Sequence, residues 1–419
     1  MANLGLKERY DFQQWIIKDL RDKNDYIQRD ATCYDPRLAM DVELLWDFLM
    51  ETQEETMDYL LKKLSKETIV NLINKEIVKG GFLFALKEGV FIENKQLRLL
   101  YRKPATSFNE KAVQQYQANC LSVMEEVVYE ESDRIDLVVF INGLALFAIE
   151  LKFNPSGQSV QDAIKQLKGR NPKNRLFRFE QGVLASFAVD TLEVYMTTQL
   201  KGQETYFLPF NVGKGEGIEM GSGNPHNPDG VDTDYLWLDV LTKDSILQLI
   251  ESFIFFEMDK HNSKKKTLIF PRYHQRRAVS RLLEDMKVNH TDSNYLIQHS
   301  AGSGKTNTIA WLAHSLVSLH DEQNQNIVDT VLIVTDRIVV DRQLQEAVKE
   351  ISHKPGVVKV MGDKETSSDL ADAIAGNTKI IATTIHKFAQ INQSNWMSVG
   401  NTAKKKFAIL IDEAHSSTT

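Results

Sequence analysis

The sequence predicts an α/β protein built from two domains, and three observations support this fold class. From residue 270 onward, apolar strand-like runs alternate with helical segments, which is the pattern of a parallel sheet with crossover helices. Between residues 121 and 153, three nearly continuous apolar runs predict strands of a second sheet that is covered on both faces. The length of 419 residues exceeds one ordinary core, because domains usually contain roughly 100–200 residues.

The composition is that of a soluble globular protein, with 42% hydrophobic and 26% charged residues. Only Cys33 and Cys120 are present, which excludes a disulfide framework and favours a reducing compartment, so we expect a cytoplasmic protein. No apolar run approaches the roughly 18 residues that cross a bilayer, so no membrane partner is expected. The net charge of −7 argues against a nucleic-acid partner only if the charges are evenly spread.

The first domain is expected to cover residues 1–210 and to begin with helices. Apolar residues recur at three- and four-residue spacing within residues 38–53, which is the pattern of an amphipathic helix. The segments that follow are expected to be strands at 124–131, 134–141 and 144–153, a helix at 161–170, and strands at 182–190 and 191–198.

Residues 211–268 are expected to link the two domains. Gly, Asn, Asp and Pro dominate residues 211–232, which predicts a long loop. A helix over 245–258 and a basic run precede the main boundary, which we place near residue 265. The second domain, residues 269–419, is expected to contain strands at 294–300, 330–336, 379–384 and 407–412, with helices after Lys305 and over 341–350.

The segment HSAGSGKT has the composition of a phosphate-binding loop between a strand and a helix. Gly302-Ser303-Gly304 allows backbone N–H groups to surround phosphate oxygens at the positive end of the next helix. Lys305 would reach the β- and γ-phosphates, and the Thr306 hydroxyl would bind Mg²⁺. The strict motif has glycine where this chain has His299, and a chance Gly-Lys-Thr loop is the alternative interpretation.

Two acidic residues, Asp412 and Glu413, come at the end of the last apolar run. An aspartate at the end of a buried strand can hold Mg²⁺, and the adjacent glutamate can position or deprotonate the attacking water. Alone, such a pair could be a solvated turn. Together with the phosphate loop, it predicts ATP and Mg²⁺ as cofactors.

The combination of GSGKT with DEAH resembles the superfamily 2 helicases and translocases, whose motor consists of two RecA-like domains. The string PRYHQ is similar to their adenine-recognising Q motif, which implies that Gln275 contacts the adenine edge and Tyr273 its face. Residues 331–337 and 382–388 resemble the motifs that contact the nucleic-acid backbone. The family's second RecA-like domain supplies arginine fingers, and its absence from this sequence implies ATP binding without competent hydrolysis or translocation.

A second constellation, Asp136, Glu150 and Lys152, interrupts two otherwise apolar strands. Glu150 and Lys152 share one face of a strand, because side chains alternate with period two. Hydrolysis of a phosphodiester needs carboxylates that hold Mg²⁺ and a cation beside the attacking water or the developing charge. The alternative is a set of ordinary strand-end charges, although burial of unpaired carboxylates is costly.

The turn between these strands decides whether the three side chains meet. A two-residue turn at Asn142-Gly143 pairs residues 141 and 144, which places Asp136 opposite Ile149 and away from Glu150. A three-residue loop over 141–143, with a bulge, pairs residues 140 and 144 and places Asp136 opposite Ala148. A functional site therefore predicts the bulged turn or an equivalent bulge within the strands.

The spacing of these three residues resembles the PD-(D/E)xK nuclease core. RecB-like members carry Gln-x-x-x-Tyr on the next helix, which implies a catalytic role for Gln166 and leaves Arg170 in place of the tyrosine. A nearby run has no acidic residue and suits contact with DNA phosphates, the alternative being a solvated basic face. It contains Lys165, Lys168, Arg170, Lys173, Arg175 and Arg178.

The order of the two sites resembles the restriction (R, motor) subunit of type I restriction–modification enzymes, over residues 120–419. The resemblance implies a type I site-specific deoxyribonuclease that pumps double-stranded DNA with ATP and cleaves it away from the recognition site. The implied partners are the methyltransferase (modification) and specificity subunits. Two alternatives stay open: a translocase whose nuclease module is inactive and only binds DNA, and a nucleotide-switched assembly module.

Overall fold

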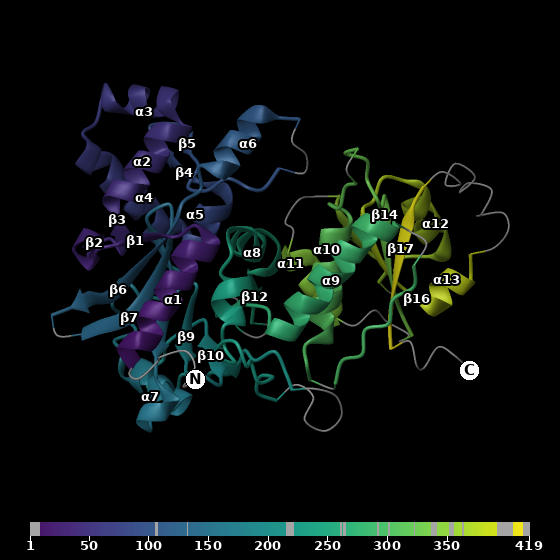
Figure 1. Ribbon diagram of the computed structural model, residues 1–419. Coiled ribbons are helices and arrows are strands. Elements are labelled where there is room, and N and C mark those ends of the chain that lie inside the picture. Colours follow the sequence, from purple (N-terminus) through teal and green to yellow (C-terminus); the bar gives the residue numbers. More distant parts are fainter. Residues whose placement is uncertain are drawn as a thin grey trace. The chain divides into compact units, whose positions relative to one another are not determined.

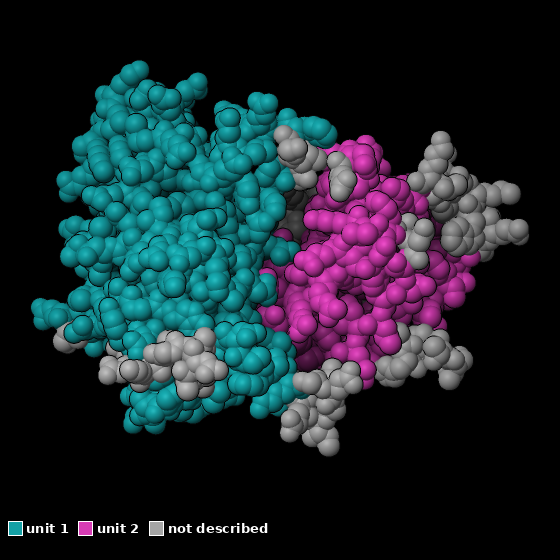
Figure 2. Space-filling view, viewed as in Figure 1, with its two compact units in different colours: residues 1–251 teal, residues 252–419 magenta. Residues whose placement is uncertain are grey.

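The computed structural model describes most of the chain (Figure 1). The described residues are 9–104, 108–131, 133–214, 222–259, 262, 265–290, 293–300, 302–321, 323–336, 342–351, 356–362, 364–391 and 405–413. Helices and strands form two compact units, residues 1–251 and 252–419, and the predicted α/β class is confirmed (Figure 2). No helix in the described ranges is long and apolar enough to cross a membrane.

A mixed sheet forms the centre of the first unit, and its main strands match the predicted ones. These strands are β6 Leu121–Glu130, β7 Asp133–Ile141, β8 Leu144–Leu151, β9 Ala185–Val189 and β10 Val194–Thr197, with β1 Ile27–Arg29 and β11 Leu208–Pro209 at the edges. Strand β9 lies parallel to β8, because helix α7 (Val160–Gly169) carries the chain across one face. Every residue of β8 is buried, as expected for a strand covered on both faces.

The face of the sheet under α7 has its own core. The helix buries Val160, Ala163, Ile164 and Leu167 in a cluster that includes Val138 of β7, Ala148 of β8 and Ala188 of β9. A capping box between Ser159 and Asp162 fixes the first turn of the helix. The helix therefore lies over one set of alternating side chains of β7 and β8.

The N-terminal part is mostly helical, as predicted. It comprises α1 Arg9–Asn24, α2 Val42–Thr52, α3 Glu54–Leu61, α4 Lys66–Gly80, α5 Phe82–Glu88 and α6 Glu110–Gln117, with the short strands β2 Tyr34–Asp35, β3 Met40–Asp41, β4 Val90–Ile92 and β5 Lys95–Leu97. Helix α2 begins where the Asp41 carboxylate accepts hydrogen bonds from the backbone N–H groups of Glu43 and Leu44. Strand β3 pairs with the start of β8, so this cap lies beside the β7–β8 turn.

The β7–β8 connection is a two-residue turn, so the predicted three-residue loop is wrong. Ile141 pairs with Leu144, and Asn142 and Gly143 have φ values of 49° and 78°. The register then shifts, because Phe140 pairs with Ala145 whereas Val139 pairs with Phe147. The prediction's other form, a bulge within the strands, is the one that the structure contains.

The bulge sets which residues lie opposite the carboxylates. Val138 pairs with Ala148 and Leu137 with Ile149, so the predicted pairing of Asp136 with Ala148 is wrong. One residue further along this register, Asp136 lies across from Glu150 on the face that α7 covers. The extra residue in β8 has restored the alternation that a plain two-residue turn would have broken.

Gly143 is expected to be essential for folding of the first unit. A Cβ atom at this position would lie 2.6 Å from the Leu45 backbone nitrogen and closer still to the Asp41 carbonyl oxygen, and its φ is +78°. We expect Gly143→Ala to lower the free energy of unfolding by about 3 kcal/mol or more, measured by urea denaturation. The matched control is Gly157→Ala, where φ is +83° but no atom lies within 4 Å of the added Cβ. That control should cost only about 1–2 kcal/mol, and equal losses would contradict this explanation.

The second unit contains a parallel four-stranded sheet, as the alternating pattern predicts. Its order is β15 Val358–Val360, β16 Ile380–Thr384, β14 Thr330–Thr335 and β17 Phe407–Asp412. The helices are α9 Tyr273–Asn289, α10 Lys305–Leu316, α11 Arg342–Ile351, α12 Ser367–Ala375 and α13 Ile385–Ala389. Strands β14 and β16 are buried at every residue, whereas β17 is partly exposed along its length.

Two predicted elements of this region are wrong. Residues 294–300 form no strand, and Leu296 is 88% exposed. Among the described strands, β17 pairs only with β14, so its other edge is open, yet residues 294–300 do not pair with it. The predicted helix over 245–258 ends early, because Phe255–Met258 forms strand β12 with β13 (Lys266–Ile269) and Phe255 packs against Trp311.

The two units divide between Glu251 and Ser252. Residues 211–214 and 222–232 form an irregular loop, as predicted. The chain then forms a π-helical turn at Leu236–Val240, helix α8 at Lys243–Gln248 and a second π-helical turn at Leu249–Phe253. The predicted linker, residues 211–268, therefore contributes structure to both units.

Candidate functional site

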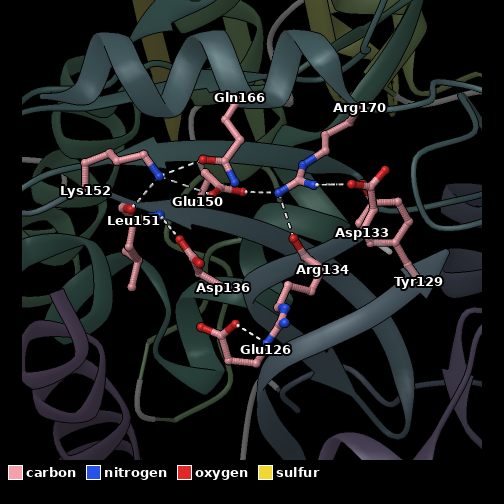
Figure 3. Close-up of polar contacts among 10 residues, drawn as sticks. All are labelled: Glu126, Tyr129, Asp133, Arg134, Asp136, Glu150, Leu151, Lys152, Gln166 and Arg170. Atoms are coloured by element: carbon pink, nitrogen blue, oxygen red, sulfur yellow. Dashed lines mark hydrogen bonds and ion pairs between the residues drawn. The ribbon is translucent and has the colours of Figure 1, made fainter. Parts of the chain in front are cut away.

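The structure brings Asp136, Glu150 and Lys152 together under helix α7 (Figure 3). Their exposed fractions are 3%, 0% and 6%, so all three charged groups are buried. Asp136 comes from β7, Glu150 from the end of β8, and Lys152 directly follows that strand. Gln166 of α7 reaches the same place, since its Oε1 accepts a hydrogen bond of 2.8 Å from Lys152 Nζ.

Each charged group of this cluster has a defined partner. Asp136 Oδ2 accepts a hydrogen bond of 2.6 Å from the backbone N–H of Leu151. Lys152 Nζ lies 3.4 Å from Glu150 Oε1 and donates to the Leu151 carbonyl oxygen at 3.1 Å. The Oε2 atom of Glu150 accepts from Arg170 Nη2 at 3.0 Å. The two oxygens of Glu150 therefore face two different cations.

Both burial and the neighbouring Asp136 carboxylate affect the pKa of Glu150. Burial raises the pKa of Glu150 to about 7, and the Asp136 carboxylate contributes to this rise in pKa. Arg170 and Lys152 oppose both effects and lower the pKa of Glu150. Two buried carboxylates that repel each other provide a place where a divalent cation would be stabilised.

The donor set suits a hard cation such as Mg²⁺. Mg²⁺ commonly takes one or two carboxylates and completes its coordination with water or substrate phosphates. Within the part of the chain that the structure describes, no group of three or more His, Cys, Asp or Glu side chains could hold a metal ion. Asp136 and Glu150 are the two predicted ligands, and they lie on neighbouring strands under one helix.

Arg170 belongs to the buried cluster, which its position in a basic run of the sequence does not predict. It is 7% exposed, and its guanidinium points into the cluster rather than toward solvent (Figure 3). Besides Glu150, it contacts the Arg134 carbonyl oxygen at 2.7 Å and the Tyr129 hydroxyl at 3.1 Å. The available signal was its spacing of four residues from Gln166, which places both on one side of α7.

The basic run over 165–178 is not a single surface. Lys165, Lys173 and Arg178 are exposed and could meet a phosphate backbone. Arg170 is buried, and the Arg175 guanidinium donates to the Asn74 side-chain oxygen at 2.9 Å. Two of the predicted phosphate contacts are therefore turned toward the protein.

The nucleotide motifs of the second unit also come together. Gly302 and Gly304 have φ values of 73° and 86°, and helix α10 begins at Lys305. The Nζ atom of Lys305 lies 2.6 Å from Glu413 Oε1 and 3.4 Å from Asp412 Oδ1, at the end of β17. Ala301 of the loop and the last two residues of the DEAH motif lie outside the described residues.

Gln275 contacts the phosphate loop itself. Its Nε2 donates to the Gly304 carbonyl oxygen at 2.9 Å, and its Oε1 accepts from the Arg272 backbone N–H at 2.8 Å. It is 4% exposed, so its amide fixes the backbone of the loop. A contact with adenine stays a prediction. His274 was not predicted, yet its Nε2 lies 3.2 Å from the Ser303 carbonyl oxygen, and burial lowers its pKa.

Each of the two units matches the model of a known protein family. Residues 38–205 match the model of the type I restriction enzyme R protein N terminus, and residues 274–419 match the SWI2/SNF2 ATPase model. The first unit is therefore similar to type I restriction enzyme R proteins, and the second is similar to SWI2/SNF2 ATPases. The predicted resemblance to the restriction subunit is thereby confirmed.

This chain is similar to curated endonuclease subunits from archaea and bacteria. It is 25% identical over 401 residues to the putative type I restriction enzyme MjaVIIIP endonuclease subunit of Methanocaldococcus jannaschii, covering 91% of this chain and 36% of that protein. It is 25% identical over 304 residues to the SauCOLORF180P endonuclease subunit of Staphylococcus aureus (strain COL), covering 71% of this chain and 29% of that protein. The chain thus spans about a third of the length of the curated relatives it matches.

Proposed function

We propose that this chain supplies the endonuclease and one RecA-like part of the motor of a type I restriction–modification complex. The observation that carries the proposal is the convergence of Asp136, Glu150 and Lys152 on one buried face, produced by the bulge in β8. A PD-(D/E)xK nuclease needs these residue types on adjacent strands. The proposed substrate is double-stranded DNA, and the proposed reaction is Mg²⁺-dependent phosphodiester hydrolysis away from the recognition site.

Each residue of the cluster has a proposed role. Asp136 and Glu150 would hold Mg²⁺, which, when bound, supplies charge for the phosphate and activates water. Lys152 provides a buried ammonium beside the Glu150 carboxylate, where it can stabilise negative charge that develops on the phosphate. Gln166 holds that ammonium in place through the 2.8 Å hydrogen bond.

The motor site is proposed to bind ATP with Mg²⁺. The glycine loop offers backbone N–H groups at the N-terminus of α10, a helix of 12 residues. Thr306 and Asp412 would hold Mg²⁺, Lys305 would bind the β- and γ-phosphates, and Glu413 would act on the attacking water. Gln275 supports the loop from α9.

The partners proposed for this chain are duplex DNA and the modification and specificity subunits. The relatives are named as endonuclease subunits of type I restriction enzymes, which supports a multi-subunit assembly. The exposed cations on and after α7, at positions 165, 173 and 178, are the proposed contacts with the DNA backbone.

The test uses the full-length protein assembled with its modification and specificity subunits. Asp136→Ala should abolish ATP-dependent cleavage and preserve ATP hydrolysis, whereas Lys305→Ala should abolish both. Asp58→Ala, which removes an exposed carboxylate on α3, is the matched control and should preserve both activities. Unchanged cleavage by the Asp136 variant would favour a translocase whose nuclease module only binds DNA.

A further inference from the structure

Arg170 occupies an unusual place for a residue of a basic run. It is the C-cap residue of α7, directly after Gly169, and only 7% of it is exposed. A phosphate contact would need a guanidinium that solvent or DNA can reach. The exposed lysines and arginine of the same run meet that condition, and Arg170 does not.

The contacts of Arg170 all lie within the first unit and converge on the carboxylate cluster. Nη2 donates to Glu150 Oε2 at 3.0 Å and to the Arg134 carbonyl oxygen at 2.7 Å. Nη1 donates to the Tyr129 hydroxyl at 3.1 Å and lies 3.4 Å from Asp133 Oδ1. The carbon of the guanidinium lies 5.6 Å from the centre of the Tyr129 ring. The guanidinium therefore joins α7 to strands β6, β7 and β8.

These contacts restrict the orientation of the Glu150 carboxylate. Arg170 binds Oε2, and Lys152 lies beside Oε1, so rotation of the carboxylate would break contact with at least one cation. Asp136 is held separately by the Leu151 backbone N–H. Removal of Arg170 would leave Glu150 buried with one weak ion pair of 3.4 Å and free to turn away from Asp136.

We propose that Arg170 is a positioning residue of the nuclease site, which fixes the Glu150 carboxylate in the orientation that binds the divalent cation. The inference rests on the proposed function and adds to it a residue that replaces the tyrosine expected at this place. Arg170 acts through Glu150 and does not contact the DNA. The guanidinium is anchored by Tyr129 and the Arg134 carbonyl oxygen, so its position does not depend on a ligand.

The first experiment measures binding of Mn²⁺ to the whole 419-residue chain by titration calorimetry. Arg170→Met should weaken Mn²⁺ binding about 10-fold or more, because outer residues that orient a metal ligand typically contribute roughly 10- to 100-fold. Arg170→Lys, which keeps a cation beside Glu150, should recover most of that loss. Arg175→Met is the matched control, since this half-buried arginine of the same run contacts Asn74 and not Glu150, and it should bind Mn²⁺ as the unmodified chain does.

The second experiment needs no metal. In the metal-free chain, Arg170→Met should lower the melting temperature of the first unit by about 5 °C, because it leaves a buried carboxylate without its main cation. In a Glu150→Gln background, the same change should cost less than half as much. This double-mutant comparison isolates the Arg170–Glu150 pair from general packing.

The outcomes separate the inference from the proposed function. Equal Mn²⁺ affinities in the Arg170→Met, Arg175→Met and unmodified chains would overturn the positioning role. Equal melting shifts in the unmodified and Glu150→Gln backgrounds would also overturn it, because Arg170 would then act through packing alone. If Mn²⁺ binding does not depend on Asp136, the proposed nuclease function fails. The positioning role then fails with it, even if the melting comparison shows that Arg170 and Glu150 interact.

Discussion

Replacement of Lys152 by alanine is expected to lower Mg²⁺-dependent DNA cleavage by about 10²–10³-fold, the typical effect of removing one group that stabilises charge in the transition state. The side chain is 6% exposed and lies between Glu150 and Gln166, so no neighbouring solvent-exposed lysine can take its place. The measurement is the initial rate of cleavage of a plasmid with a recognition site, by the full-length protein with its partner subunits. ATP hydrolysis should stay near the unmodified rate, because Lys152 belongs to the first unit.

Lys79→Ala is the control for the Lys152 prediction. Lys79 is an exposed lysine in the last turn of α4, so its loss removes the same charge without touching the carboxylate cluster. This control should cleave normally. Cleavage by the Lys152 variant at the control's rate would exclude Lys152 from the chemistry and favour a module that binds DNA without cutting it.

The second large effect is expected at the phosphate loop. Lys305→Ala should weaken ATP binding to the 419-residue chain by about 100-fold, which corresponds to roughly 3 kcal/mol for a charge-assisted contact with phosphate. The measurement is titration calorimetry with Mg²⁺ and ATP. Lys349→Ala, an exposed lysine of α11 in the same unit, is the matched control. Unchanged affinity in the Lys305 variant would contradict the assignment of this loop as the nucleotide site.

Glu413→Gln should have the opposite effect on ATP affinity. Lys305 Nζ lies 2.6 Å from Glu413 Oε1, and the hydrogen bonds and charges of Glu413 and Asp412 outweigh burial and raise the pKa of Lys305 above its ordinary value. Phosphates must compete with Glu413 for the ammonium, so a neutral amide at position 413 removes the competitor. The same titration should show tighter binding, and weaker binding would indicate that Glu413 supports the nucleotide-free loop rather than competing with ATP.

Much of the first unit could be predicted, because its strands and its candidate site carry strong local signals. The runs around Asp136 and Glu150 are apolar except for the charges of the site, so both the strands and the interruption were visible. The sequence predicted a turn at Asn142-Gly143 but not the number of residues in its loop. In the two-residue turn, the Asn142 side chain donates a hydrogen bond to the Leu99 carbonyl oxygen and accepts one from the Cys120 backbone N–H. Both partners lie more than 20 residues away in the sequence.

The wrong predictions concern residues whose structure depends on contacts with residues far away in the sequence. Residues 294–300 have the composition of a strand, but a strand exists only beside a partner that supplies hydrogen bonds. The apolar run over 255–258 fits a helix by spacing, yet pairing with β13 decides its conformation. Arg170 seemed a surface cation because its neighbours in the sequence are basic. Its burial depends on Tyr129 and Glu150, which lie 41 and 20 residues away.

The bulge near Leu146 has a consequence for how this hairpin can change in evolution or in the laboratory. Deletion of one residue between the turn and Glu150 would be absorbed by loss of the bulge, and Asp136 would stay across from Glu150. Insertion of one further residue there, without a second bulge, would turn Glu150 and Lys152 to the opposite side of the sheet. The fold could survive such an insertion, since both sides of β8 are apolar and buried. This hairpin should therefore keep its carboxylates together after losing one residue from β8 but not after gaining one.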